Sequence, residues 1–272
     1  MTSMRARRSA LWIALTTALT ALAACTSSDR PAEESRAAPA AAVTAALRTV
    51  ERSTDRAESA RVRSTTTMGS SLSMKADGAL AWSDGLTGTL KITYTGGTTA
   101  ETMRRLGTTS MEARYLPDAY YARLGETFAE KADGRHWIRY VYDDLKNLAG
   151  SAGADLANQM RGNAPHTAVK LLLSSADVRK VGEETVRGVR ATRYSGTVQG
   201  EGSGTQTVEI WVDDRNLLVK KVEKGRTATG GLTQTAYYAD YGVKATAEKP
   251  PAGDTADFKE LLKIRGGLDG TR

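Results

Sequence analysis

The sequence is poor in cysteine, histidine and phenylalanine. Among its 272 residues are one cysteine, two histidines and two phenylalanines. A single cysteine excludes a disulfide framework, so the hydrophobic core must hold the folded domain together. The histidines, His136 and His166, stand in no metal-binding spacing, and no second cysteine could complete a zinc site with them. We therefore expect neither a metal nor a cofactor.

Sequence motifs of catalysis are also missing. There is no Gly-x-Ser-x-Gly nucleophile elbow, and the glycine-rich stretch at 200–204 does not follow a strand and open a helix, as a phosphate loop would. The adjacent carboxylates of Asp143-Asp144 and Asp213-Asp214 would point to opposite faces of a strand, so neither pair is an acid/base dyad. We expect that the protein is not an enzyme.

The N-terminus has the pattern of an export signal. Arg5, Arg7 and Arg8 precede an apolar run that starts at Leu11 and is too short and too rich in Ala and Thr to make a good membrane-spanning helix. This predicts a signal peptide over residues 1–24. Removing it takes away three arginines and no acid, which lowers the net charge from +7 to +4.

The only cysteine follows this segment directly. Residues 22–25, Leu-Ala-Ala-Cys, resemble the lipobox of bacterial lipoproteins. The resemblance implies cleavage before Cys25, a diacylglycerol on its sulfur, and anchoring at the extracytoplasmic face of the cell membrane. An ordinary secretory signal with a stray cysteine is the alternative. Residues 25–41, rich in Ser, Ala, Pro and charge, are then a lipidated tether.

Charge allows two interpretations of the mature surface. A mildly basic surface favours anionic lipid headgroups weakly, and a basic surface that is merely solvated explains the same charge. Export of the chain argues against a nucleic-acid partner.

Hydrophobic periodicity divides the rest of the chain. A helical stripe of Val43, Leu47 and Val50 precedes a long region of period two, with turns at Asp84-Gly85 and Pro117-Asp118. Helical patterns return over 143–160 and after Asn163, and strands resume with turns at Arg187-Gly188 and over 213–216. On the last hairpin, Leu218 and Val222 are expected to share a face.

This order predicts an α+β fold with one large, curved antiparallel sheet. About ten twisted strands tend to curl, and the few helices are the available cover for the apolar, concave face. The predicted domain runs over residues 42–248, and residues 249–272 are a C-terminal tail. Three strand tryptophans, Trp82, Trp137 and Trp211, could stack on a sugar or contact a membrane, although packing in the core is their commoner role.

The second half of the domain resembles a known family. Gly182, Glu183, Gly188, Tyr194, Trp211, Val212 and Asp213 match the hairpin and strand pattern of the LppX/LprA/LprF/LprG lipoproteins of actinobacteria, within the LolA-like superfamily. The resemblance implies a half-barrel with helices against its concave side. It also implies an apolar pocket that binds acyl lipids or lipoprotein acyl chains for transfer between membrane layers.

The pocket candidates are apolar residues of the strands and helices. They are Leu80, Trp82, Leu90, Ile92, Leu148, Leu156, Val169, Leu172, Leu173, Val208, Ile210 and Val212. The same residues could equally fill a core, and the glycine-containing segment around Leu148–Leu156 could be a flexible gate or an irregular surface helix. A sensory lipoprotein, similar to RseB, that binds a membrane-protein partner is the alternative function.

Overall fold

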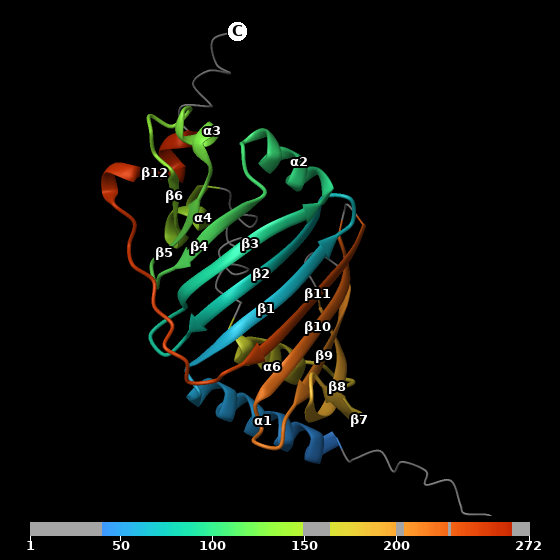
Figure 1. Cartoon of the computed structure of the whole chain (residues 1–272). Coiled ribbons are helices and arrows are strands. Elements are labelled where there is room, and N and C mark those ends of the chain that lie inside the picture. Colours follow the sequence, from blue (N-terminus) through green and yellow to red (C-terminus); the bar gives the residue numbers. More distant parts are fainter. Residues whose placement is uncertain (1–39, 149–163, 200–203, 228–229, 263–272) are drawn as a thin grey trace, which may run out of the picture. The chain divides into compact units, whose positions relative to one another are not determined.

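The structure, a computed structural model, describes residues 40–148, 164–199, 204–227 and 230–262 (Figure 1). All of them lie in one compact unit, Ala37–Arg272. The helices are α1 (Ala40–Arg56), α2 (Gly97–Arg105), α3 (Glu126–Ala129), α4 (Tyr142–Leu148), α6 (Pro165–Leu173) and the 3-10 turn η1 (Ala252–Asp254). The strands are β1 (Ser59–Met68), β2 (Leu72–Ala81), β3 (Thr87–Gly96), β4 (Ser110–Tyr115), β5 (Ala119–Arg123), β6 (Trp137–Val141), β7 (Arg179–Val186), β8 (Val189–Gln199), β9 (Thr205–Val212), β10 (Leu218–Thr227), β11 (Gly230–Ala239) and β12 (Thr255–Asp257).

The strands form one twelve-stranded sheet in the order β12-β6-β5-β4-β3-β2-β1-β11-β10-β9-β8-β7. From β1 the chain runs outward as a meander to β6, and from the far edge at β7 it returns as a second meander that closes against β1. Neighbouring strands are antiparallel except β12 and β6, which are parallel. The predicted α+β class and the large antiparallel sheet are confirmed.

Strand β12 extends the sheet beyond the predicted domain. Residues 249–272 were expected as a tail, yet Thr255, Ala256 and Asp257 pair with Trp137, Ile138 and Arg139. A strand of three residues is too short to show a hydrophobic period in the sequence. It forms here because it pairs with β6, more than a hundred positions earlier in the chain. The sheet therefore has more strands than the ten or so predicted.

Helix α1 forms where the stripe predicted it. Val43, Leu47, Val50 and Thr54 are its buried residues, and they recur at helical spacing on one face. Helices α2 and α3 were not expected. The buried residues of α2 are only Ala100 and Met103, which is too short a stripe to stand out in the sequence.

Two turns follow from local chemistry. Arg187 and Gly188 have φ angles of 49° and 85°, the conformation of a two-residue hairpin turn that matches strand twist. In the turn after β9, the Asp213 carboxylate accepts hydrogen bonds from the backbone N–H of Arg215 (3.0 Å) and Leu217 (2.8 Å). Asp213 is therefore a turn residue, as its place at a strand end predicted.

The sheet has two chemically different faces. On β1 the side chains of Ala60 and Val62 are buried, whereas Arg61 and Arg63 are exposed. We call the face with Ala60 and Val62 the helix-side face, because its buried residues share one core with α1 and α6. The opposite face is the open face. In Figure 1, α6 lies behind the strands and α1 runs along the lower end of the sheet.

One prediction of facing was wrong. Leu218 belongs to the core shared with α1 and α6, but Val222 packs on the open face with Val186, Ala191 and Trp211. A register shift between Leu218 and Lys220 inserts the extra residue that separates them.

Candidate functional site: the helix-side face of the sheet

The helix-side face gathers most of the predicted pocket residues into one buried cluster. Its members include Leu80, Trp82, Leu90, Ile92, Val169, Leu172, Val208, Ile210 and Val212, and Leu173 packs against it while partly buried. Leu148 is the last residue of α4, and its side chain lies outside the described part of the structure, as do Leu156 and Cys25. Whether the cluster lines a lipid pocket stays a prediction.

Small residues occupy the middle of this face. In one row across the sheet Ala236, Ser64 and Ala76 are direct neighbours on β11, β1 and β2. In the next row the neighbours are Gly78 on β2, Leu90 on β3, Ala113 on β4 and Ala122 on β5, and the Leu90 side chain lies against Gly78. The alanines and the serine in these rows supply less side-chain volume than Leu or Phe would at the same positions. Ala236 and Ala113 are 2% and 0% exposed, so the small residues let other core side chains approach the sheet closely.

Apolar side chains toward the β2–β6 side of the face remain partly accessible. Met74, Tyr94, Met111, Tyr140 and Phe258 pack against the core but are only partly buried. Helix α6, by contrast, packs on β8, β9 and β10, at the other side of the sheet. The helix-side face thus combines a covered region under α6 with an apolar region that is partly accessible.

Tyrosines bring polar atoms into this apolar region. The ring of Tyr120 lies 5.1 Å from that of Tyr115 and 5.8 Å from that of Tyr140, and Tyr140 stacks at 4.7 Å on Phe258. Burial raises the pKa of Tyr140 to about 12 and raises the pKa of Tyr115 and Tyr120 as well. All three phenols are therefore neutral at physiological pH.

A charged pair is also buried here. The Lys221 ammonium lies 2.9 Å from the Glu223 carboxylate, and their side chains are 7% and 12% exposed. Burial by itself lowers the pKa of Lys221, but Glu223 and Tyr238 outweigh it, so the pKa is raised and the lysine stays charged. In the sequence the pair was not recognised, because only the register shift on β10 decides which of Lys220 and Lys221 faces inward.

Trp82 joins three elements at the α1 end of the face. Its indole N–H donates to the Asp55 carbonyl (3.0 Å), and its ring lies 6.2 Å from His166 and 6.3 Å from Tyr241. Burial lowers the pKa of His166, which favours the neutral ring. Trp82, Trp137 and Trp211 are 7%, 4% and 3% exposed, so their rings pack in the interior.

His136 connects the C-terminal segment to the sheet. Its Nδ1 lies 2.7 Å from an Asp254 carboxylate oxygen and its Nε2 lies 3.1 Å from Glu126. These hydrogen bonds, first that of Asp254 and then that of Glu126, raise the pKa of the ring.

In the described residues no group of three or more His, Cys, Asp or Glu could hold a metal ion. Likewise, none of the described helices has the length and apolarity to cross a membrane.

Comparison with known proteins agrees with this architecture. No protein-family model matches the chain. It is 61% identical over 286 residues to the protein named "Putative lipoprotein SCO4650" of Streptomyces coelicolor, covering 98% of this chain and 100% of the relative. It is 47% identical over 251 residues to an uncharacterised 31.2 kDa protein of Streptomyces griseus, covering 83% and 82% of the two chains.

Solved structures of low sequence identity share the fold. LprF from Mycobacterium bovis is 15% identical with a TM-score of 0.51, and the match covers 79% of this chain and 99% of LprF. LppX from Mycobacterium tuberculosis is 17% identical with a TM-score of 0.51, over 77% and 100%. The name of the second structure describes LppX as a lipoprotein. The chain therefore belongs to the family of its 61%-identical Streptomyces coelicolor relative, and it has the half-barrel fold of LppX and LprF.

Proposed function

We propose that the protein is a membrane-anchored lipoprotein whose helix-side face binds the acyl chains of a lipid or of another lipoprotein. In this proposal residues 1–24 are removed on export and Cys25 carries the anchor at the extracytoplasmic face. Residues 25–41 then tether the folded domain, within reach of membrane lipids.

The observation that carries the proposal is the composition of the helix-side face. Small residues such as Ser64, Ala76 and Ala236 stand side by side in its centre, and partly accessible apolar side chains such as Met74 and Met111 border them. Each methylene transferred from water to such a surface contributes about 0.8 kcal/mol, so a chain of even moderate length would bind well. No cluster of catalytic groups is needed for this role.

The direct test is the lipid content of the purified protein. The mature chain with Cys25→Ser, which cannot be acylated, is expressed in an actinobacterial host, and bound lipid is detected by native mass spectrometry and by extraction. Recovery of about one acylated lipid per chain is expected. A lipid-free chain that also fails to bind a fluorescent fatty acid contradicts the proposal.

A matched pair of variants locates the binding face. Ser64 lies on the helix-side face and Thr67 on the open face of the same strand. Ser64→Phe should weaken binding of the fluorescent fatty acid at least tenfold, because the ring occupies the space proposed for the acyl chain. Thr67→Phe should bind as the parent chain does, and thermal unfolding of both variants verifies that they fold.

The sensory alternative gives a different result in the same preparation. A protein that senses through a partner should retain one specific membrane protein on cross-linking and pull-down. Capture of such a partner by a chain that carries no lipid would favour the sensory role over transfer.

A further inference from the structure

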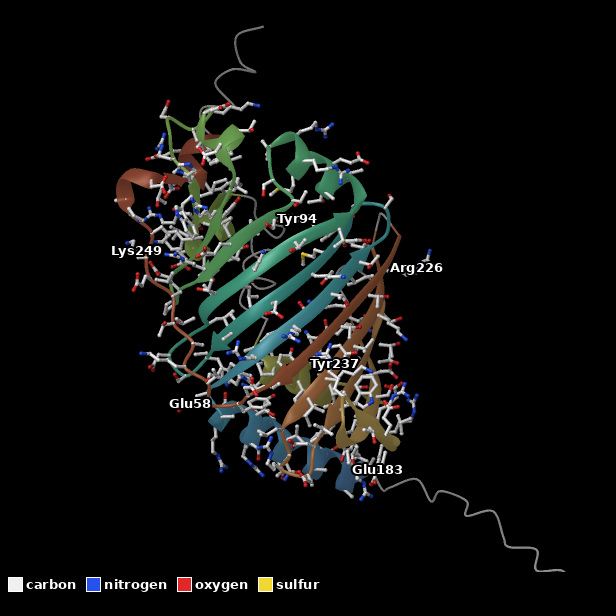
Figure 2. All side chains as sticks on the ribbon, viewed as in Figure 1. Glu58, Tyr94, Glu183, Arg226, Tyr237 and Lys249 are labelled. Carbon is white, nitrogen blue, oxygen red and sulfur yellow. The ribbon has the colours of Figure 1, made fainter. Side chains whose placement is uncertain are left out.

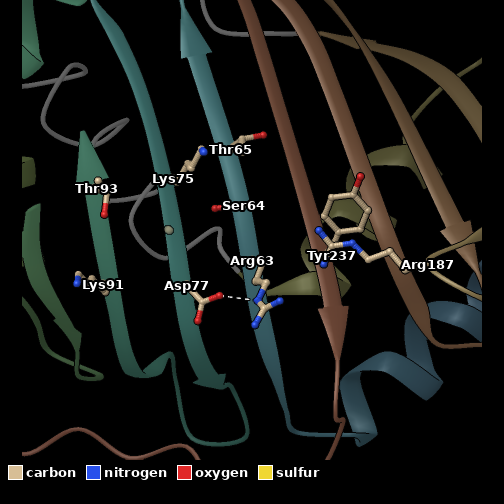
Figure 3. Close-up of a pocket in the computed structure, with 10 residues that line it drawn as sticks. Arg63, Ser64, Thr65, Lys75, Asp77, Lys91, Thr93, Arg187 and Tyr237 are labelled. Carbon is tan, nitrogen blue, oxygen red and sulfur yellow. Dashed lines mark hydrogen bonds and ion pairs between the residues drawn. The ribbon is translucent and has the colours of Figure 1, made fainter. Parts of the chain in front are cut away.

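The open face of the sheet carries two hollows that share one lysine. The first, of about 340 Å³, is lined by Arg63, Ser64, Thr65, Lys75, Ala76, Asp77, Lys91, Thr93, Arg187 and Tyr237 (Figure 3). The second, of about 440 Å³, is lined by Thr89, Lys91, Thr108, Ser110, Met111, Glu112, Arg123, Leu124 and Gly125. Both lie over strands whose opposite face forms the candidate lipid site, and Lys91 contributes to both. We call the first hollow the cationic groove.

A hairpin tip supplies one wall of the cationic groove. The Arg187 guanidinium, from the turn between β7 and β8, stacks 3.7 Å from the ring centre of Tyr237 on β11. Val186, beside it, packs with Val222 and Tyr237 on the open face. The tip of the hairpin thus lies against a strand that is three places away from β8 in the sheet. Tyr237, labelled in Figures 2 and 3, marks the contact.

Positive charge in the groove exceeds negative charge. The single carboxylate, that of Asp77, pairs with Arg63 at 2.6 Å. For Lys75, Lys91 and Arg187, no carboxylate among the described residues forms an ion pair. These three cations form no ion pair, although Lys91 is the cross-strand neighbour of Asp77 and Glu112, so the groove keeps an excess of positive charge that favours the binding of an anion.

The pairing of β1, β2 and β3 brings the charged and hydroxyl side chains of the groove close together. Lys75 is the direct neighbour of Thr65 on β1 and of Thr93 on β3, and Lys91 is the neighbour of Asp77. Ammonium groups and threonine hydroxyls can together donate hydrogen bonds to the several oxygens of a phosphate group. The groove is thus suited to a compact oxyanion with several acceptor atoms.

We propose that the cationic groove binds the phosphate-bearing headgroups of anionic phospholipids, so that the open face docks on the membrane surface while the helix-side face holds acyl chains. Charge complementarity argues for this occupant. The inference rests on the envelope location in the proposed function, which keeps the groove close to a membrane. It adds a second lipid contact that differs in chemistry from the first.

The test is sedimentation with vesicles. The mature Cys25→Ser chain, which lacks the anchor, is mixed with vesicles of phosphatidylcholine alone or of an equimolar mixture with phosphatidylglycerol. The chain should sediment with the mixed vesicles and stay in solution with the phosphatidylcholine vesicles. Binding to the mixed vesicles should weaken as the salt concentration rises. Lys75→Gln combined with Lys91→Gln should weaken binding about 30-fold, since each lysine near an anionic surface contributes roughly a tenfold or smaller factor.

Lys131→Gln combined with Lys170→Gln is the matched control. Both lysines are exposed and lie outside the two hollows, so this variant loses the same charge and should bind as the parent does. Equal weakening by the two double variants would show that only net charge matters, which overturns the proposal. Binding of inorganic phosphate or of poly-glutamate without binding of the mixed vesicles overturns it as well.

The readouts of the two sites are separate. Lys75→Gln with Lys91→Gln should still bind the fluorescent fatty acid. A parent chain that binds anionic vesicles but no fatty acid would refute acyl binding and support the groove, and the opposite pattern would refute the groove alone.

Discussion

Two adjacent lysines on β10 have opposite environments. Lys221 faces the core, buried beside Glu223. Lys220 faces the other way, and its ammonium lies 3.8 Å from the ring centre of Trp211 on the open face. The same residue type therefore contributes through a buried ion pair at one position and through a cation–π contact at the next.

Replacing these lysines should have unequal effects. Lys221→Met leaves the Glu223 carboxylate buried without its partner, which should lower the free energy of unfolding by about 3–5 kcal/mol. Lys220→Met removes the ammonium contacts with the Trp211 and Tyr237 rings and should cost about 0.5–1 kcal/mol. Urea unfolding at neutral pH measures both.

A double variant separates the pair from the packing. Lys221→Met with Glu223→Leu removes both charges together and should recover most of the stability that Lys221→Met loses. If the double variant were as unstable as the single one, the loss would come from packing and not from an uncompensated charge.

At the scale of elements, the contact of α6 with β8 depends on one glycine. A Cβ at Gly196 would lie 2.9 Å from Leu172 Cδ1 and 2.5 Å from Ser175 Oγ, at the end of α6. Asp177, just beyond, accepts hydrogen bonds from the Thr197 backbone N–H (2.6 Å) and hydroxyl (2.9 Å). Helix α6 therefore contacts β8 directly at Gly196, where there is no room for a side chain between the helix and the strand.

Gly196→Ala should therefore push α6 away from β8. Overpacking of this kind should lower the free energy of unfolding by about 1–3 kcal/mol. Gly231→Ala on β11 is the control, since a Cβ there meets nothing within 4 Å, and it should be neutral or stabilise by up to about 1 kcal/mol. The midpoint of thermal unfolding is measured for each variant. Equal midpoints for Gly196→Ala and Gly231→Ala would contradict the close contact between α6 and β8.

At the scale of the whole domain, segments distant in the chain close the sheet. β11 pairs with β1 in the middle, and β12 extends the sheet beyond β6. Before β12, the C-terminal segment crosses the open face, where the Arg114 guanidinium donates to the Glu248 carbonyl at 2.9 Å; Lys249 marks this segment in Figure 2. Arg139 and Asp257 then pair at 2.7 Å between β6 and β12.

Truncation after Glu248 should destabilise the domain. It removes the Arg139–Asp257 pair, the His136–Asp254 contact and the stacking of Phe258 on Tyr140. The expected loss is about 2–3 kcal/mol, measured by urea unfolding. Truncation after Phe258 keeps these contacts and should retain most of the stability. Equal stability of the two truncated chains would mean that β12 adds nothing.

Local patterns were enough to predict the meanders. Alternation placed Leu90 and Ile92 opposite Lys91, and the turn residues Arg187-Gly188 fixed a hairpin, because each depends on neighbours a few positions away. The helical stripe of α1 was equally local. The pocket candidates came together because a strand face, once chosen, commits every second residue to the same side.

Contacts between distant segments could not be predicted in this way. The register shift that turns Lys221 inward and Val222 outward, the addition of β12, and the stacking of Arg187 on Tyr237 each require knowledge of which strands lie side by side. The sequence by itself determined an α+β meander, an apolar face and a cysteine in a lipobox-like motif. Only the tertiary structure decided which charges are buried and which line a groove, because a side chain's environment depends on the strands that pack across from it.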